Sequence, residues 1–111
     1  MTKRISEYRV MWLMVFFDLP TTTKKEIRAY TSFRKNLIHD GFTMFQFSIY
    51  IRHCASMENC NVHRKRVKSF LPEFGKVGIL VITDKQFGDI ELYFNQVQHA
   101  SNAPGQQLEL F

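Results

Sequence analysis

The sequence has 111 residues, of which 45% are hydrophobic and 14% aromatic, and it carries a net charge of +5 at pH 7. This composition is typical of one packed domain and excludes an intrinsically disordered chain. No apolar run approaches the ~20 residues that a membrane-spanning helix needs, and the N-terminus lacks the apolar core of a signal peptide. With only two cysteines, Cys54 and Cys60, the sequence predicts a reduced, cytoplasmic protein without a disulfide framework.

The positive charge is unevenly distributed along the chain. Residues 1–76 contain fourteen Lys or Arg against six Asp or Glu, a net charge of +8, whereas residues 77–111 carry −3. A basic body indicates a polyanionic partner, most often nucleic acid, although an ordinary solvated surface carries similar charges. The acidic C-terminal third is better suited to contacts with protein.

The N-terminal part predicts a strand followed by a helix. The apolar run within residues 8–17 is typical of a strand buried on both faces, and it ends at Asp18, the only charge in VMWLMVFFDLP. The sequence Thr23-Lys24-Lys25-Glu26 fits a capping box. With apolar residues at helical spacing behind it, this box predicts a helix from about Lys24 to His39.

Residues 42–52 alternate in character, which predicts either one long strand or two strands joined through a bulge. One face is expected to join the core: Phe45, Phe47, Ile49 and Ile51. The other face is mixed in character and is expected to meet another subunit: Met44, Gln46, Ser48, Tyr50 and Arg52.

The C-terminal half predicts a second helix and further strands. Ser56 caps a helix that runs to about Phe70, with Met57, Cys60, Val67 and Phe70 inside and His63, Arg64, Lys65, Arg66 and Lys68 outside. Residues 77–83 predict a buried strand, 84–89 a turn and 90–95 another strand. A polar linker over 96–107 then leads to the short apolar end LELF.

This order predicts an α+β, ferredoxin-like βαββαβ sandwich with an extra C-terminal strand. Residues 1–95 form the domain, and residues 96–111 form the linker and short strand. Two helices would cover one face of an antiparallel sheet. Because the other face would be exposed without a second copy, a homodimer is expected.

Asp18 is the first candidate for chemistry. As a helix-entry residue it would interact with the helix dipole, but Thr21–Thr23 are better placed for capping. If a two-fold axis passes near the strand end, Asp18 meets its symmetry mate, and the two carboxylates repel unless a divalent cation neutralises them. Ligation by oxygen alone suits Mg²⁺ or Mn²⁺.

Other groups of residues offer further candidates. The cysteines and histidines at 53–63 match no common zinc spacing, so buried thiols are favoured over a metal site. Lys24 and Lys25, with Arg28 behind them, follow Asp18 at a helix start, where they are suited to holding a phosphate. An aromatic sheet that stacks the bases of single-stranded RNA is the main rival use of this fold, but its sequence signature is missing.

Several segments together resemble one known family. VMWLMVFFDLP followed by TTTKKE, then GFTMFQFSIYIRHC, then GILVITDKQFGDIELYF are similar to the CRISPR-associated adaptation endonucleases. These are the smaller of the two core spacer-acquisition proteins, and the similarity is greatest to members from type II systems. It covers about residues 8–95, and the motifs, among them the pair Gln46 and Ser48, occur in the family's order.

The resemblance implies a ferredoxin-like protomer in a two-fold dimer, with Asp18 of each protomer facing the axis and holding one Mg²⁺ (or Mn²⁺). It implies metal-dependent cleavage of RNA or DNA, with Asp18 as catalytic residue and metal ligand. It also implies a central dimer that bridges two dimers of the CRISPR integrase and carries duplex protospacer DNA on a basic surface. The candidate nucleic-acid-binding residues are Lys24, Lys25, Arg28 and Arg52. The end LELF resembles a strand used against the integrase or the partner protomer.

Three functions stay open from the sequence: a weak metal-dependent endonuclease, a non-catalytic DNA-binding scaffold of the integration complex, and a module that binds single-stranded RNA. Small-molecule sensing has no supporting pocket motif.

Overall fold

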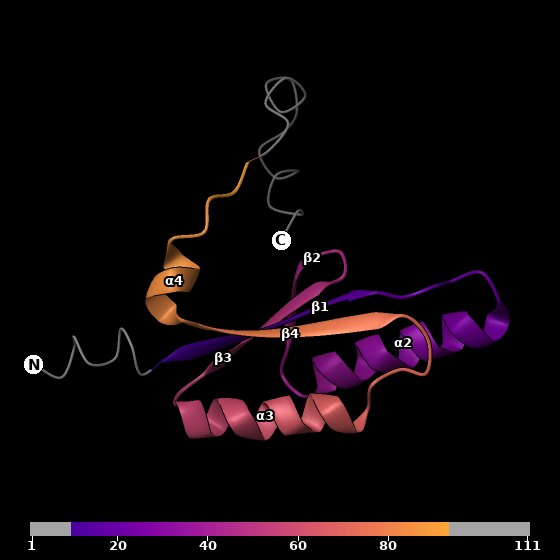
Figure 1. Cartoon of the computed structure of the whole chain (residues 1–111), viewed down its shortest axis with the longest axis horizontal. Helices are drawn as coiled ribbons and strands as arrows, with labels where there is room; N and C mark the ends of the chain where they lie inside the picture. Colours follow the sequence, from indigo (N-terminus) through magenta and orange to yellow (C-terminus); the bar gives the residue numbers. More distant parts are fainter. Residues whose placement is uncertain (1–9, 94–111) are drawn as a thin grey trace, which may run out of the picture.

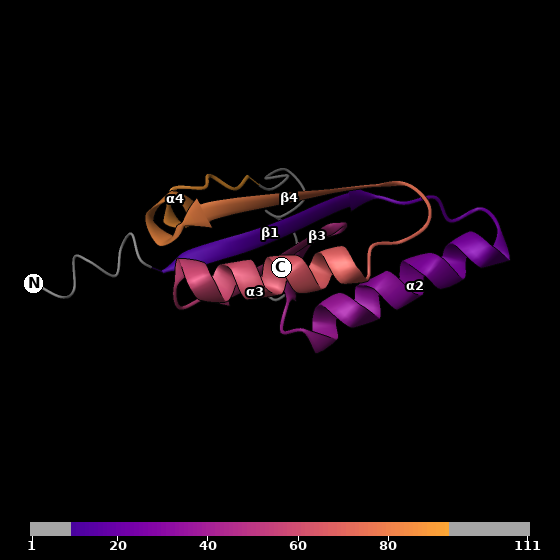
Figure 2. The same ribbon diagram turned by 60° about the horizontal axis from the view of Figure 1, so that its bottom comes forward.

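The computed structural model describes residues 10–93. Four antiparallel strands form one sheet in the order β2-β3-β1-β4, and two long helices cover one of its faces (Figures 1 and 2). The elements are β1 (Met11–Asp18), α2 (Lys24–His39), β2 (Thr43–Gln46), β3 (Ile49–Cys54), α3 (Met57–Ser69), β4 (Lys76–Thr83) and the short α4 (Asp84–Gly88). The predicted α+β, ferredoxin-like βαββαβ order is confirmed.

Both long helices begin at the caps that the sequence indicates. The Thr23 hydroxyl accepts the Glu26 N–H at 3.1 Å, and the Glu26 carboxylate accepts the Thr23 N–H at 3.0 Å, which completes the capping box of α2. The Ser56 hydroxyl accepts the Asn59 N–H at 3.1 Å at the start of α3. Local side chains therefore fix where each helix starts.

Strand β1 lies at the centre of the fold, between β3 and β4. Its alternate residues Met11, Leu13, Val15 and Phe17 are buried beneath the helices. The remaining core comes from the helices and from β3: Phe33, Leu37, Phe42, Tyr50, Cys54, Cys60 and Val67. Strand β1, apolar up to Asp18, thus divides its side chains between a packed face and a face that α2 and α3 do not cover.

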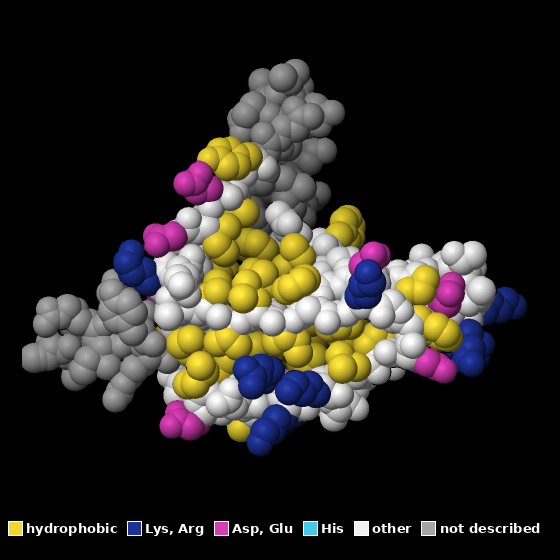
Figure 3. All heavy atoms as spheres, in the orientation of Figure 1, with side chains coloured by type: hydrophobic (Ala, Val, Ile, Leu, Met, Phe, Trp, Pro, Cys, Tyr) yellow, Lys and Arg dark blue, Asp and Glu magenta, His cyan; other side chains and the backbone are white. Residues whose placement is uncertain are grey.

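The face that the described helices α2 and α3 leave uncovered, here called the open face, is also apolar. By strand register it presents Trp12, Met14, Phe16, Ile49, Ile51, Leu80 and Ile82. Phe16 and Leu80 are 45% and 47% exposed. Figure 3 shows hydrophobic side chains gathered between α4 and the β2–β3 hairpin. Helix α4 covers only one end of this face, where Phe87 stacks on Trp12 with ring centroids 4.1 Å apart.

The hairpin over residues 42–52 corrects the predicted facing of its side chains. Two strands are present, with a register shift between Met44 and Gln46 and a turn at Phe47 and Ser48. Phe47 is 85% exposed instead of joining the core, whereas Tyr50 is 2% exposed and lies within it. By register Met44 shares a face with Tyr50, and both pack in the core, whereas Ile49 and Ile51 lie on the open face. The alternation is therefore present, but the face expected to meet another subunit is the one that the helices cover.

Helix α3 corrects two further assignments. His63, predicted to lie outside, is 5% exposed, and Met57, predicted to lie inside, is 47% exposed. Cys60, His63 and Val67 share one face at helical spacing, and this is the face that packs on the sheet. The buried side of α3 therefore includes His63 and excludes Met57.

The segment after β4 also differs from its prediction. The predicted turn at 84–89 is largely the helix α4, because Thr83 and Gln86 form a second capping box. Residues 90–93 have no regular secondary structure, so the strand predicted over 90–95 is wrong there. Because α4 turns the chain away from β4, these residues have no neighbouring strand in the described chain to pair with. The linker and strand predicted over 96–111 lie outside the described residues. In the part of the chain that the structure describes, no helix has the length and hydrophobicity to cross a membrane.

Candidate active site at the end of strand β1

Asp18 is the last residue of β1, and its side chain is exposed. Strand alternation places it on the open face, two residues after Phe16, and the register pairs it with Lys76 of β4. Among residues 10–93, no hydrogen bond or ion pair involves its carboxylate. A carboxylate that is fixed by a strand and has no partner among these residues is suited to bind a ligand.

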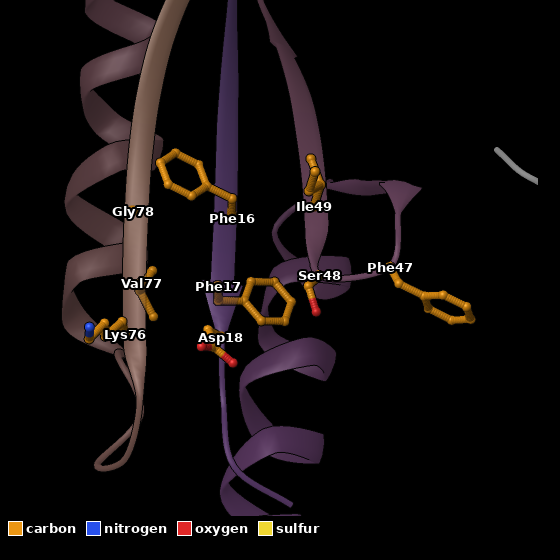
Figure 4. Close-up of a pocket in the computed structure, with 9 residues that line it drawn as sticks. All are labelled: Phe16, Phe17, Asp18, Phe47, Ser48, Ile49, Lys76, Val77 and Gly78. Carbon is orange, nitrogen blue, oxygen red and sulfur yellow. The ribbon is translucent and has the colours of Figure 1, made fainter. Parts of the chain in front are cut away.

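A pocket of about 530 Å³ surrounds this carboxylate. It is lined by Phe16, Phe17, Asp18, Phe47, Ser48, Ile49, Lys76, Val77 and Gly78. In Figure 4 the Asp18 carboxylate and the Ser48 hydroxyl lie at the same end of the sheet, while the Phe47 ring extends away from it. The pocket combines aromatic rings, one acid, one hydroxyl and one lysine, and its volume is in the range of ligand sites, roughly 300–1,000 Å³.

The backbone of Asp18 is held from both sides. Gly75, with φ +83°, packs so closely that a Cβ there would lie 2.5 Å from the Asp18 carbonyl oxygen. On the other side, the Phe17 N–H donates to the Ser48 carbonyl at 3.0 Å. Only glycine fits the first position, both for its φ and for its space. The end of β1 is thus clamped between two loops.

The neighbouring Phe16 ring is also placed by a glycine. A Cβ on Gly78 would lie 2.3 Å from the Phe16 ring, so the ring occupies the space that a side chain would take. Figure 4 shows this ring leaning toward β4. A flat aromatic surface therefore lies beside Asp18 on the open face.

The chain's own donors fit a divalent cation only as half of a site. Within the part of the chain that the structure describes, no group of three or more His, Cys, Asp or Glu side chains is suited to hold a metal ion. Asp18 supplies carboxylate oxygens of the kind that Mg²⁺ and Mn²⁺ prefer. A second copy of the chain would supply the remaining protein oxygens.

The candidate phosphate-binding residues fall into two places. Lys24, Lys25 and Arg28 are exposed on the first turns of α2, which starts just beyond the loop that follows Asp18 (Figure 1). Arg52 lies farther back along the sheet, opposite Leu13. Its guanidinium donates to the carbonyls of residues 40 and 53, at 2.8 Å each. Neither the three α2 residues nor Arg52 is among the residues that line the Asp18 pocket.

Comparison with known proteins gives the same assignment as the motifs. The family model described as CRISPR associated protein Cas2 matches residues 11–90. The chain belongs to the Cas2 family. It is 56% identical to a protein of Flavobacterium psychrophilum over 97% of this chain and 94% of that protein. It is 50% identical to one of Parvibaculum lavamentivorans over 91% and 100%. Both relatives are named CRISPR-associated endoribonuclease Cas2.

This Cas2 chain contains another acid, Asp40, whose side chain is 9% exposed and whose role sequence reasoning missed. The Asp40 carboxylate accepts from His63 Nδ1 at 2.8 Å and from Arg66 Nη1 at 2.9 Å. Burial by itself would raise the pKa of Asp40, but the hydrogen bonds from His63 and Arg66 outweigh it and lower that pKa. The position of His63 between Cys60 and Val67, at helical spacing, was the available signal.

The two cysteines of the Cas2 chain are free and buried, as the sequence predicts. Burial raises the pKa of the Cys54 thiol to about 11 and also raises the pKa of Cys60. Thiols that stay protonated at neutral pH are poor metal ligands and poor nucleophiles. With His63 bonded to Asp40, this arrangement supports the prediction of buried thiols instead of a zinc site.

Proposed function

We propose that this Cas2 family protein acts in CRISPR spacer adaptation as a basic homodimer that binds nucleic acid and bridges dimers of the CRISPR integrase. We propose in addition that paired Asp18 residues support Mg²⁺- or Mn²⁺-dependent hydrolysis of phosphodiester bonds in RNA or DNA. The observation that carries the proposal is the position of Asp18, an exposed carboxylate without a partner among the described residues, at the edge of an uncovered apolar face.

The open face supports the homodimer. Its side chains form a continuous apolar surface over three strands, and such surfaces on soluble proteins mark interaction sites. A second copy offers the same apolar surface, so a two-fold arrangement covers both at once. Asp18 projects from that face, so a two-fold axis that passes near the end of β1 would bring the two Asp18 carboxylates together.

Like-charged carboxylates in proximity supply the reason for a metal. Each would raise the free energy of the other unless a cation lies between them. Asp18 of the two protomers would hold Mg²⁺ or Mn²⁺, which when bound polarises the phosphate and activates water. The chain itself orients Asp18 through the Gly75 and Ser48 loops, and the lysines of α2 would bind the neighbouring phosphates.

The charge of the helices supports nucleic-acid binding. Lys24, Lys25 and Arg28 lie beyond the end of β1, and Figure 3 shows further Lys and Arg side chains gathered over α3. Each phosphate that such a side chain neutralises releases counterions and makes the affinity depend on salt. We also propose Arg52 as a nucleic-acid contact. Its guanidinium donates two hydrogen bonds to backbone carbonyls and has further N–H groups that can bind a phosphate.

A non-catalytic scaffold is the second candidate, and one observation favours it. The described residues that line the Asp18 pocket include no histidine and no second carboxylate to serve as a general base. In a scaffold of this kind the dimer binds protospacer DNA and the integrase, and Asp18 takes no part.

Cleavage assays separate the two candidates. Labelled RNA and duplex DNA are incubated with Mg²⁺ or Mn²⁺ and either the wild-type protein, Asp18→Ala or the control Asp89→Asn, which changes an exposed acid away from the pocket. We expect Asp18→Ala to lose more than the 10- to 100-fold that removal of a metal's outer-shell partner costs. The control should cleave normally. Activity that survives Asp18→Ala removes Asp18 from catalysis.

Binding assays test the nucleic-acid surface independently of cleavage. Reversing both charges, in Lys24→Glu/Lys25→Glu, should weaken duplex DNA binding and lower the slope of log affinity against log salt by about one for each phosphate that the variant no longer neutralises. Lys85→Glu on α4 serves as the matched control. Unchanged duplex affinity and unchanged spacer acquisition in the double variant would exclude these lysines as DNA-binding residues.

A further inference from the structure

We propose that Phe47 is a base-stacking residue of the Asp18 pocket, so that this pocket takes a strand with an unpaired base beside the bound phosphate. The inference rests on the proposed function in one respect, since it takes the ligand at Asp18 to be a nucleic acid. The new element is a residue that distinguishes single-stranded from paired nucleic acid. The inference does not require that the strand be cleaved.

The exposure of Phe47 is not explained by folding. Its side chain is 85% exposed, more than any other large hydrophobic side chain among the described residues. A phenyl ring in water contributes no burial energy to the fold. Exposed aromatic rings beside a polar pocket are a general feature of surfaces that stack nucleic-acid bases.

The backbone of the hairpin holds this ring outside the sheet. Ser48 has φ +65°, and it is the only described residue other than glycine with a positive φ. A left-handed conformation costs a residue with a side chain roughly 1–2 kcal/mol. Together with the register shift after Met44, this turn takes Phe47 away from the core that its sequence position predicts. Strain of this kind is concentrated at functional sites.

The lining of the pocket matches the parts of a nucleotide. Phe16 and Phe47 offer aromatic surfaces for a base, and Lys76 offers a cation for a phosphate. The Ser48 hydroxyl and the Asp18 carboxylate lie between these, at the end of the sheet (Figure 4). A base paired in a duplex has both of its faces occupied by stacked neighbours, whereas an unpaired base can place one face on Phe47.

A second copy of the chain is the other possible occupant of this surface. In that case Phe47 would insert into the partner protomer and contribute to the dimer instead of to a ligand. The lining beside the ring favours the nucleotide, because Lys76 offers a cation for a phosphate and Ser48 a hydroxyl, neither of which an apolar contact between two open faces requires. Strand binding and dimer formation, measured on the same variants, separate the two occupants.

Binding is measured on full-length Asp18→Asn protein, which keeps the strand uncut whether or not the wild-type protein is a nuclease. Fluorescence anisotropy compares a labelled single strand of about 12 nucleotides, within the usual site size of single-strand-binding grooves, with a duplex of the same sequence. Three changes are added to this background: Phe47→Ala, Phe47→Trp and the control Ile38→Ala, which removes a half-exposed apolar side chain from α2. Sedimentation of each variant reports the dimer.

We expect Phe47→Ala to weaken single-strand binding about 5- to 150-fold, the cost of removing one base stack, and to leave duplex binding unchanged. Phe47→Trp should retain single-strand affinity, and Ile38→Ala should change neither affinity. A single strand with one abasic position, moved along the sequence, gives a second readout. One position should weaken binding to the Phe47 protein, and that loss should vanish in Phe47→Ala.

Three results would overturn the proposal. Equal losses for single strand and duplex would make Phe47 a general contact, and no loss would remove it from the site. A shift of Phe47→Ala from dimer to monomer would assign the ring to the partner protomer. In each case duplex binding by the parent protein still supports the proposed function, whereas its absence would refute that function separately.

Discussion

Two aspartates, one after helix α2 and one at the end of strand β1, have opposite surroundings. Asp40, after α2, accepts hydrogen bonds from His63 and Arg66, and its side chain is 9% exposed. Asp18, at the end of β1, is exposed and has no hydrogen-bond or ion-pair partner among the described residues. The first acid ties α2 to α3, and the second ties no two described elements together. The difference separates a carboxylate that serves the fold from one that is left for a ligand.

The two faces of the sheet repeat this contrast. The helix-covered face is a closed core in which Tyr50 and Phe33 are almost fully buried. The open face is equally apolar but leaves Phe16 and Leu80 nearly half exposed. Because one apolar face of the sheet is buried and the other is exposed, the exposed face is suited to bind a partner.

The largest effect on stability should come from Asp40. We expect Asp40→Ala to lower the free energy of unfolding by about 2–4 kcal/mol, because it leaves buried His63 without its acceptor. Asp18→Ala should change it by no more than about 0.5 kcal/mol, as for other exposed sites. Urea unfolding of the two variants beside the wild type measures both. Equal effects would break the distinction between the two acids.

The contribution of Asp40 should depend on pH in a defined direction. Its pKa is lowered from the ordinary 3.8, so its extra stability is present in full above that unfolded-state pKa and is lost as the pH falls through the lower folded-state value. The part of the unfolding free-energy difference between wild type and Asp40→Ala that comes from this carboxylate should therefore shrink below about pH 4. Urea titrations from neutral pH down to about pH 2.5 would show this. A difference that persists unchanged at the acid end contradicts the assignment.

The smallest effect concerns the hairpin beside Asp18. Ser48→Gly relieves the left-handed strain but adds freedom to the unfolded chain, so stability should rise by at most about 1 kcal/mol. Ser48→Ala keeps the strain and should not be stabilised. Thermal unfolding compares the pair. A destabilised Ser48→Gly would mean that the conformation is not strained.

The sequence predicted the parts of the fold that local chemistry determines. The helix at 24–39 follows from its capping box, and the β1 run follows from unbroken apolarity. Asp18 was found because one acid at the end of such a run is conspicuous. These features depend on neighbours within a few residues, which the sequence displays directly.

The errors arose where the environment of a side chain depends on distant parts of the chain. Alternation over residues 42–52 shows that the strands have two faces but not which face the helices cover, so Tyr50 was expected outside and Ile49 and Ile51 inside. His63 was placed outside because histidine is usually exposed, and its acceptor lies 23 positions away. Pairings between distant residues are visible only in three dimensions.

The proposed metal site requires that two chains hold one cation through Asp18. Titration of the dimer with Mn²⁺, followed by electron paramagnetic resonance, counts the bound ions directly. We predict one Mn²⁺ per two chains, and no such binding in Asp18→Asn, while Asp40→Asn retains it at temperatures where that variant is folded. One Mn²⁺ per chain, or full binding by Asp18→Asn, would contradict the shared site.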